Sequence, residues 1–412
     1  MRLERFIARR LYKSEQEGQR MSRPAVVIAM AGVALGLAVM IVTLCISLGF
    51  KHEIQSKAIG FNSHLHISSY DAGLSYETTP ICADDTLTSL VSAVASVRHV
   101  QRYATKPGIF RTKDDFLGFV LKGVGSEYDL SFFKDYLQEG TVDSISPGHN
   151  ALLISRSMAD RLQVGVGDKV DTYFIEQTIR ARRLKVCGIY ETGFVDFDDL
   201  FAICDLRTVQ TLNGWDNDEI TGLEVAINDY RQLDQMAYEV GTTIDEFGTS
   251  RGTSYYLQTI EEQNPSLFAW LDVLNMNVLL ILLLMLGVAG FTVISGLLIL
   301  ILERTQLIGI LKALGSPNIS IRKTFLYLSA YIVGKGMLWG NAIGLGICAI
   351  QKYTGLIPLD PKNYYLDCVP IEFNWLLIVL LNVGMLILSV SMLIVPSHLI
   401  SRISPSKSIR FE

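Results

Sequence analysis

The chain has 412 residues, of which 50% are apolar, and its mean hydropathy is +0.32. It is too apolar for an ordinary soluble enzyme and too polar for a protein made only of membrane helices, so we expect a mixed architecture. The net charge of −5 is uneven: residues 51–272 carry 19 basic and 33 acidic side chains, a net of −14, whereas the rest carries 17 and 8, a net of +9. An acidic soluble part argues against a nucleic-acid partner, because phosphate binding needs positive charge.

Residues 1–24 predict an amphipathic helix that lies along the membrane surface. One helical face is apolar and the opposite face is basic. The apolar face comprises Leu3, Phe6, Ile7 and Leu11, and the basic face comprises Arg5, Arg9 and Lys13.

Four apolar segments predict transmembrane helices. Residues 25–49 contain no charged side chain, and at about 1.5 Å per residue they are long enough for a hydrocarbon core of about 30 Å. This segment is too long for a cleaved signal peptide and lacks a small-residue cleavage site. The predicted spans are residues 25–50, 271–302, 325–350 and 375–396.

The distribution of lysine and arginine predicts the topology. Basic residues are frequent before the first span, in the 303–324 loop and in the 397–412 tail, and sparse in the 351–374 loop. Because basic loops stay in the cytoplasm, both termini and residues 303–324 are expected there. Residues 51–270 and 351–374 are then outside.

Glycines four residues apart lie on one helix face in the first and third spans, where they allow close helix approach within the subunit or across a dimer. They are Gly32, Gly36, Gly336, Gly340 and Gly344. Lys335 in the third span either reaches the interface, faces the bundle interior or meets a lipid headgroup, and a structural partner is favoured.

Residues 51–270 predict an α+β domain, in one or two lobes. Strand-like and helix-like segments alternate along it. Strands are expected over 65–67, 116–124, 151–154, 169–174, 183–190, 200–204, 223–227 and 255–257, and helices over 84–97, 155–162 and 230–247.

This domain has no recognisable catalytic, cofactor or metal motif. His64 and His66 share a strand face, and a satisfied surface pair is favoured over a metal site that would lack a third ligand. Cys187 and Cys204 are either free buried thiols, which we favour, or cross-strand neighbours. The acidic residues Asp196, Asp198 and Asp199 are expected in a solvated loop. A binding or force-transmitting module is therefore expected, without catalytic, cofactor or metal residues.

The loop after the second span predicts a short helix that ends at Gly315–Pro317. An apolar stripe of Ile308, Leu311 and Leu314 either docks into the groove of another protein or packs against the chain itself. At the C-terminus, Ser404 and Pro405 predict the cap and first position of another short helix.

Taken together, these segments resemble the MacB/FtsX-like (type VII) ABC transporter permeases, most closely the lipoprotein-releasing LolC/LolE branch. The resemblance follows the order of elements over nearly the whole chain, and its most specific motif is similar to the family's coupling helix. The matching segments are Gly32–Val42, Leu48–Phe50, Ala151–Arg156, Val166–Lys169, Val186–Gly193, Glu303–Arg304, Ile308–Gly315, Leu359–Leu366 and Pro405–Arg410.

The resemblance implies a permease subunit in the bacterial inner membrane, paired with an identical copy or a paralogue above two copies of a separate ABC-type ATPase. Such a machine uses ATP hydrolysis to release acylated lipoproteins from the outer leaflet and pass them to a periplasmic carrier. Its ATPase-coupling residues are expected to be Glu303, Arg304, Ile308, Gly309, Ile310, Leu311, Lys312, Ala313, Leu314 and Gly315.

The outer ends of the first two spans are expected to contact the acyl chains, through Ser47, Leu48, Phe50, Met276 and Leu279. The hairpin of residues 173–183 is short and lacks prolines, so carrier capture by this loop does not follow from the resemblance. Two alternatives stay open: an FtsX-like transmitter that regulates a cell-wall hydrolase, which the large domain disfavours, and a MacB-like efflux permease, which usually carries its ATPase in the same chain.

Overall fold

The computed structural model describes residues 6–7, 23–70, 76, 79–111, 116–175 and 179–397. The chain divides into two compact units. The helical unit comprises Met1–His52, Leu271–Pro358 and Cys368–Glu412, and the sheet unit comprises Glu53–Trp270 and Leu359–Asp367. The expected surface helix of residues 1–24 and the C-terminal helix at Ser404 lie almost wholly outside the described residues.

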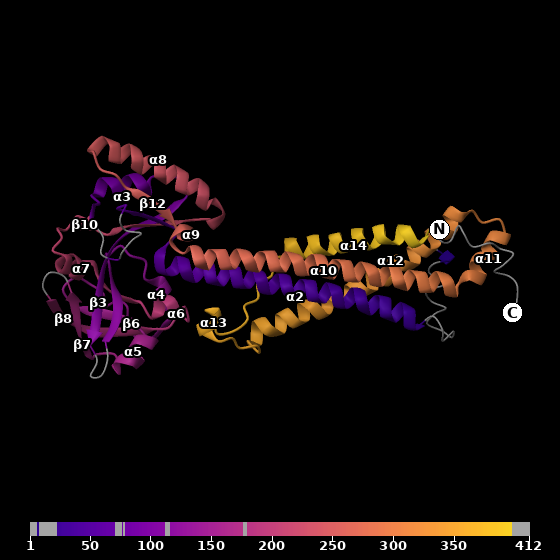
Figure 1. Ribbon diagram of the computed structural model, residues 1–412, viewed down its shortest axis with the longest axis horizontal. Coiled ribbons are helices and arrows are strands. Elements are labelled where there is room, and N and C mark those ends of the chain that lie inside the picture. The colour runs from indigo at the N-terminus through magenta and orange to yellow at the C-terminus, as the bar shows by residue number, and fades with distance from the viewer. Residues whose placement is uncertain are drawn as a thin grey trace. The chain divides into compact units, whose positions relative to one another are not determined.

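Within the described part of the chain, four helices are long and apolar enough to cross a membrane, and each contains one predicted span (Figure 1). The first two, α2 and α10, have 40 and 39 residues and so measure about 60 Å, roughly twice the hydrocarbon core. The last residues of α2 and the first of α10 belong to the sheet unit. The helices are α2 (Arg23–Asn62), α10 (Pro265–Glu303), α12 (Asn318–Thr354) and α14 (Trp375–Ser397), with the short α11 (Thr305–Ala313) between α10 and α12.

The glycines of the helical unit lie where helices meet inside the chain. Gly36 of α2 lies against Ala289 of α10, and a Cβ at Gly340 of α12 would come within 2.8 Å of the Ala34 carbonyl oxygen of α2. Because glycine has no side chain, the backbones can approach this closely. Gly32, Gly336 and Gly344 make equivalent approaches, so both glycine faces serve packing within the subunit. Lys335 is exposed on α12, which excludes the bundle interior for this side chain.

A ten-stranded mixed sheet forms the centre of the sheet unit, in the order β12-β1-β11-β3-β4-β9-β6-β8-β5, with β7 paired to β3 and β8. The pairs β4–β9 and β6–β8 are parallel, and the other pairs in this sheet are antiparallel. Strands β2 (Ile81–Cys82) and β10 (Glu219–Ile220) pair separately. The sheet consists of β1 (Leu65–Ser68), β3 (Val97–Arg111), β4 (Phe116–Val124), β5 (Leu137–Gly140), β6 (Ala151–Ser155), β7 (Lys169–Ile175), β8 (Ile179–Tyr190), β9 (Phe201–Asp205), β11 (Gly222–Ile227) and β12 (Tyr256–Thr259).

Helices complete this unit, and apolar side chains such as Phe110, Leu121 and Ile154 form its core. The predicted fold class, four membrane helices with an α+β domain between the first two, is confirmed. The helices are α3 (Asp85–Ser92), α4 (Ser131–Asp135), α5 (Arg156–Leu162), α6 (Val195–Asp198), α7 (Leu206–Asn213), η1 (Tyr230–Gln232), α8 (Leu233–Arg251), α9 (Ile260–Gln263) and α13 (Pro361–Tyr364).

Three expectations about local structure were wrong. The helix predicted over 84–97 ends at Ser92, and residues 97–111 form β3, the longest strand of the sheet. His64 and His66 are buried rather than on the surface, and no metal-binding group of His, Cys, Asp or Glu occurs among the described residues. Asp198 is also buried, where it accepts hydrogen bonds from Thr192 and Gly193, so it does not lie in a solvated loop.

The order of strands in the sheet decides whether Cys187 and Cys204 are cross-strand neighbours. Cys187 lies on β8 and Cys204 on β9, and β6 lies between these two strands. The two thiols are therefore not cross-strand neighbours, and both are free. Cys204 is a buried free thiol as favoured, whereas Cys187 is free but only half-buried.

Candidate functional site

The predicted coupling helix exists as α11, set off from the long helices at both ends. Glu303 is the last residue of α10, and Arg304 caps α11 with non-helical dihedral angles. At the other end, Gly315 takes φ +83°, a left-handed conformation that glycine adopts without strain. The Ser316 amide then donates to the Leu311 carbonyl at 3.0 Å, which completes a tight stop before α12.

The apolar face that α11 leaves open differs from the predicted stripe. Ile308 is fully buried in the core of the helical unit, which also contains Ile321 and Phe325 of α12, and Leu311 is half-buried against the same core. Their apolar side chains pack against the chain's own third span, so for these two residues the alternative of packing within the chain holds. Ile310 and Leu314 are instead 50% and 78% exposed.

Ile310, Ala313 and Leu314 are spaced three and four residues apart and therefore share one helical face. All three are exposed. We call this set the open face of α11. The remaining coupling candidates are divided: Gly309 is buried, Arg304 and Lys312 are half-buried, and Glu303 and Gly315 are exposed.

The predicted acyl-chain residues lie on α2 and α10, two helices that approach each other at Gly32 and Gly36. Gly32 and Gly36 of α2 face Thr292 and Ala289 of α10, respectively. Residue numbers therefore rise along α2 as they fall along α10, so the two helices run antiparallel. Extending this register by about fifteen residues along each helix brings 47–50 level with 276–279. Met276 and Leu279 are 67% and 53% exposed, and Ser47, Leu48 and Phe50 are half-buried.

Within the sheet unit, the end of α2 is fixed by a buried cation. Lys57 is 4% exposed, and its Nζ donates to the carbonyl oxygens of Thr192 at 2.5 Å and of Tyr365 at 3.0 Å. One turn further, Phe61 packs edge-on against Phe132 and Phe133, with ring centroids 5.2 and 5.5 Å apart. The helix is therefore joined to the sheet unit by a hydrogen-bonded cation and by an aromatic cluster.

The segment of residues 359–367, which connects α12 and α14, docks onto the same region. The Tyr365 hydroxyl donates to Asp196 at 3.0 Å, and its ring packs edge-on against Phe194 with centroids 4.9 Å apart. Burial raises the pKa of the neighbouring Asp198 to about 6, against the hydrogen bonds from Thr192 and Gly193 that lower it.

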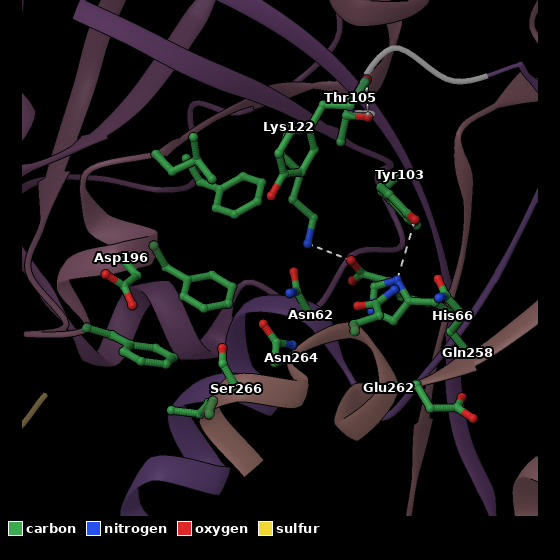
Figure 2. A pocket seen from close by; sticks show the side chains of 18 of the residues that line it. Asn62, His66, Tyr103, Thr105, Lys122, Asp196, Gln258, Glu262, Asn264 and Ser266 are labelled. Atoms are coloured by element: carbon green, nitrogen blue, oxygen red, sulfur yellow. Dashed lines mark hydrogen bonds and ion pairs between the residues drawn. The ribbon is translucent and has the colours of Figure 1, made fainter. Parts of the chain in front are cut away.

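A cavity of about 690 Å³ opens in the sheet unit beside these contacts (Figure 2). Amide, hydroxyl and carboxyl groups line it together with aromatic rings. The lining includes Asn62, His66, Tyr76, Tyr103, Thr105, Lys122, Phe194, Asp196, Phe197, Phe201, Glu224, Gln258, Glu262, Asn264, Ser266, Trp270, Asn363 and Tyr365.

A buried ion pair forms part of the cavity wall. Lys122 Nζ lies 2.5 Å from Glu224 Oε1 and donates to the Phe61 carbonyl at 2.6 Å, and the other Glu224 oxygen accepts from Gln101 and Tyr128 at 2.9 Å. Burial lowers the pKa of Lys122, whereas the nearby ammonium holds the pKa of Glu224 below its usual range despite burial. The two groups are therefore partners of each other in the cavity wall.

Beside this pair, burial lowers the pKa of His66 to about 4, so its imidazole is neutral near pH 7. Its Nδ1 lies 3.4 Å from the Tyr103 hydroxyl, and Nε2 completes no hydrogen bond although the backbone of Asn62 lies near the ring. No sequence pattern indicated this cavity, because its residues come from segments far apart in the chain. Only the alternation of His64 and His66 pointed to one of them.

Comparison with known proteins identifies two family domains. Residues 26–242 match the MacB-like periplasmic core domain, and residues 279–405 match the FtsX-like permease C-terminal domain. The lipoprotein-releasing system transmembrane protein LolC of Xylella fastidiosa is 22% identical over 93% of both chains. The LolE protein of Haemophilus influenzae is 23% identical over 98% of both chains. The periplasmic region of MacB from Actinobacillus actinomycetemcomitans is 14% identical, over 51% of this chain and 94% of that one, with a TM-score of 0.36.

The first family model covers more than half of the chain, and the second covers most of the remaining C-terminal residues. Their order agrees with the fold: the sheet unit is inserted after the first membrane helix, and the remaining membrane helices come after it. The chain therefore belongs to the family of permeases that combine a MacB-like periplasmic core domain with an FtsX-like membrane domain.

Proposed function

We propose that the chain is the permease subunit of an ABC transporter that releases lipoproteins from the outer leaflet of the bacterial inner membrane. The observation that carries the proposal is the full-length similarity to lipoprotein-releasing subunits of both the LolC and the LolE type. The two kinds of relative match about equally well, so pairing with an identical copy and pairing with a paralogue are both compatible with the chain.

The energy for release would come from two copies of a separate ABC-type ATPase. Transfer of a lipid anchor out of the bilayer costs about 0.8 kcal/mol for each methylene that leaves the apolar core, so external work is needed. The open face of α11 offers apolar area for a groove on the ATPase, and α11 connects directly to α10. Movement of α11 would then be carried along α10, which continues into the sheet unit without a break.

In this arrangement both termini and α11 face the cytoplasm and the sheet unit faces the periplasm. The acyl chains would contact α2 and α10 at the level of Phe50 and Met276, where α10 exposes apolar side chains. A periplasmic carrier would accept the released lipoprotein. The exposed apolar residues of this part of α10 include Val273, Leu279, Leu280, Leu283 and Leu284.

The test is co-purification of the ATPase with variants of the open face. Ile310→Asp and Leu314→Asp place a charge in the proposed contact, so we expect ATPase recovery to fall at least tenfold while the permease still inserts. Leu356→Asp is the matched control, because Leu356 is similarly exposed at 73% but follows the other end of α12. Leu311→Asp is a poorer choice, since Leu311 also packs against the chain's own core.

Cells that carry the same variants test whether lipoproteins are the substrate. Depletion of the wild-type chain, or its replacement by Leu314→Asp, should trap acylated lipoproteins in the inner membrane. Normal lipoprotein sorting in the depleted strain, together with recovery of a cell-wall hydrolase in complex with the chain, would replace this proposal with a signal-transmitting function. Unchanged ATPase recovery with both variants would remove the coupling role of α11.

A further inference from the structure

The cavity of the sheet unit has the properties of a ligand site rather than of a packing defect. Its volume of about 690 Å³ lies within the usual range for ligand pockets, about 300–1,000 Å³. A purely apolar defect would hold few polar groups, whereas this wall presents amide, hydroxyl and carboxyl side chains together with a buried ion pair. Ligand pockets combine apolar area with a few polar groups that orient the ligand, and this wall offers both.

The charges around the cavity restrict the ligand. Lys122 and Glu224 neutralise each other, and His66 carries no charge near pH 7. The exposed carboxylates of Asp196 and Glu262 have no further basic side chain among the lining residues to balance their charge. The lining therefore carries a net charge of about −2, which repels phosphate groups and favours an uncharged or basic ligand.

The other lining groups suit a peptide. Side-chain amides present both a donor and an acceptor, as a peptide backbone requires, and they come from Asn62, Gln258, Gln263, Asn264 and Asn363. Aromatic rings in the same lining give apolar area for side chains. These rings belong to Phe194, Phe197, Phe201, Trp270 and Tyr365.

We infer that this cavity binds a short peptide segment with uncharged or basic side chains. The inference deepens the proposed function, on which it rests for the source of the peptide: a segment of the protein substrate. Asn62 is the last residue of α2, Ser266 is in the first turn of α10, and Asn363 lies in the segment between α12 and α14. A peptide in the cavity therefore touches each segment of the sheet unit that continues into a membrane helix.

The experiment measures binding to the full-length chain in lipid nanodiscs by titration calorimetry. The probes are acetyl-Ser-Gly-Lys-Ser-Gly-Lys-amide, the same hexapeptide with Glu in place of Lys, and inorganic phosphate. The lysine peptide should bind, and the glutamate peptide should bind at least tenfold more weakly. Equal binding of both peptides, or tighter binding of phosphate, would overturn the inference.

Three variants locate the binding. Ser266→Trp fills the cavity and should abolish binding of the lysine peptide. Glu262→Gln keeps the hydrogen bond from the Thr259 amide that caps α9, yet removes a charge, so the affinity should fall about two- to fivefold. Glu261→Gln is the matched control, because Glu261 is the adjacent exposed acid and does not line the cavity.

The binding assay tests the peptide site separately from the proposed function, because the assay contains neither ATPase nor lipoprotein. Absence of peptide binding in a chain that still releases lipoproteins would refute the peptide site alone. Peptide binding that persists in Ser266→Trp would place the binding elsewhere and refute this assignment.

Discussion

At the residue scale, burial of His64 in the sheet unit gives the chain a pH-dependent stability. Burial, together with the positive charge of the nearby Arg98, lowers the pKa of His64 to about 4. In the unfolded chain the imidazole takes up a proton near pH 6.5, but in the folded chain it stays neutral until about pH 4. Between these values the unfolded state binds more protons, so the free energy of unfolding falls as the pH is lowered from about 6.5 to about 4.

We expect His64→Gln to reduce this loss by about 3 kcal/mol, because the two pKa values differ by about 2.5 units and each unit is worth about 1.4 kcal/mol. The measurement is denaturant unfolding of the purified chain at several pH values between 7 and 4.5. His149→Gln, at an exposed histidine of the same unit, is the control for the loss of an imidazole as such. His66 contributes to the pH dependence of stability in the same sense, so part of that dependence remains in the His64 variant. A His64 variant that showed the full wild-type dependence would contradict this account.

At the element scale, the third and fourth membrane helices are joined by a pair of amides. The Asn341 amide of α12 donates to Asn382 of α14 at 2.7 Å, and the Asn382 amide donates back at 3.0 Å. In the hydrocarbon core an unpaired amide is costly, because neither lipid nor water is there to replace its partner. The pair should therefore fix how α12 and α14 pack.

We expect Asn382→Leu to destabilise the helical unit by about 1 kcal/mol, since it leaves the Asn341 side chain without its reciprocal partner. The double variant with Asn341→Leu should recover most of that loss, because no amide is then left unpaired. A double-mutant cycle of denaturant unfolding in detergent micelles measures the coupling. Strict additivity of the two single substitutions would show that the pair contributes nothing.

The elements also show what sequence patterns could and could not reveal. The membrane helices were predictable because long uncharged segments have few alternatives, and β4 was predicted at its observed bounds, Phe116–Val124. Strand β3 was missed, since Pro107 and several charged residues interrupt its pattern. Its polar residues are tolerated inside because tertiary partners satisfy them: Gln101, for example, donates to Glu224 at 2.9 Å.

The candidate site was likewise predictable from the sequence only in part. The position of α11 followed from local signals, a continuing helical pattern and a glycine stop, and the structure places a short helix there. Its open face did not follow, because the burial of Ile308 depends on residues of α12 that the pattern of α11 does not contain. The cavity and the Lys57 contacts were beyond sequence reasoning for this reason too: Lys57 meets Tyr365, which is 308 positions away in the chain.

At the scale of the whole molecule, two uninterrupted helices connect the units along the chain. Neither α2 beyond Pro24 nor α10 beyond Pro265 contains a proline, the usual cause of a kink. Lys57 and Phe61 fix the end of α2 within the sheet unit, and α11 follows directly after α10. This connectivity suits the transfer of a displacement along the helix axis better than the passage of a substrate through the protein.

That interpretation requires α11 and the sheet unit to face opposite sides of the membrane. With the exposed Cys82 and Cys368 and the partly exposed Cys187 replaced by serine, Leu314→Cys and Tyr238→Cys give the accessible reporters on α11 and α8. We expect a membrane-impermeant maleimide to label Tyr238→Cys in intact spheroplasts, and to label Leu314→Cys only after the membrane is permeabilised. Labelling in the reverse order would place the open face of α11 out of reach of a cytoplasmic ATPase, and a mechanism driven from that face would no longer be tenable.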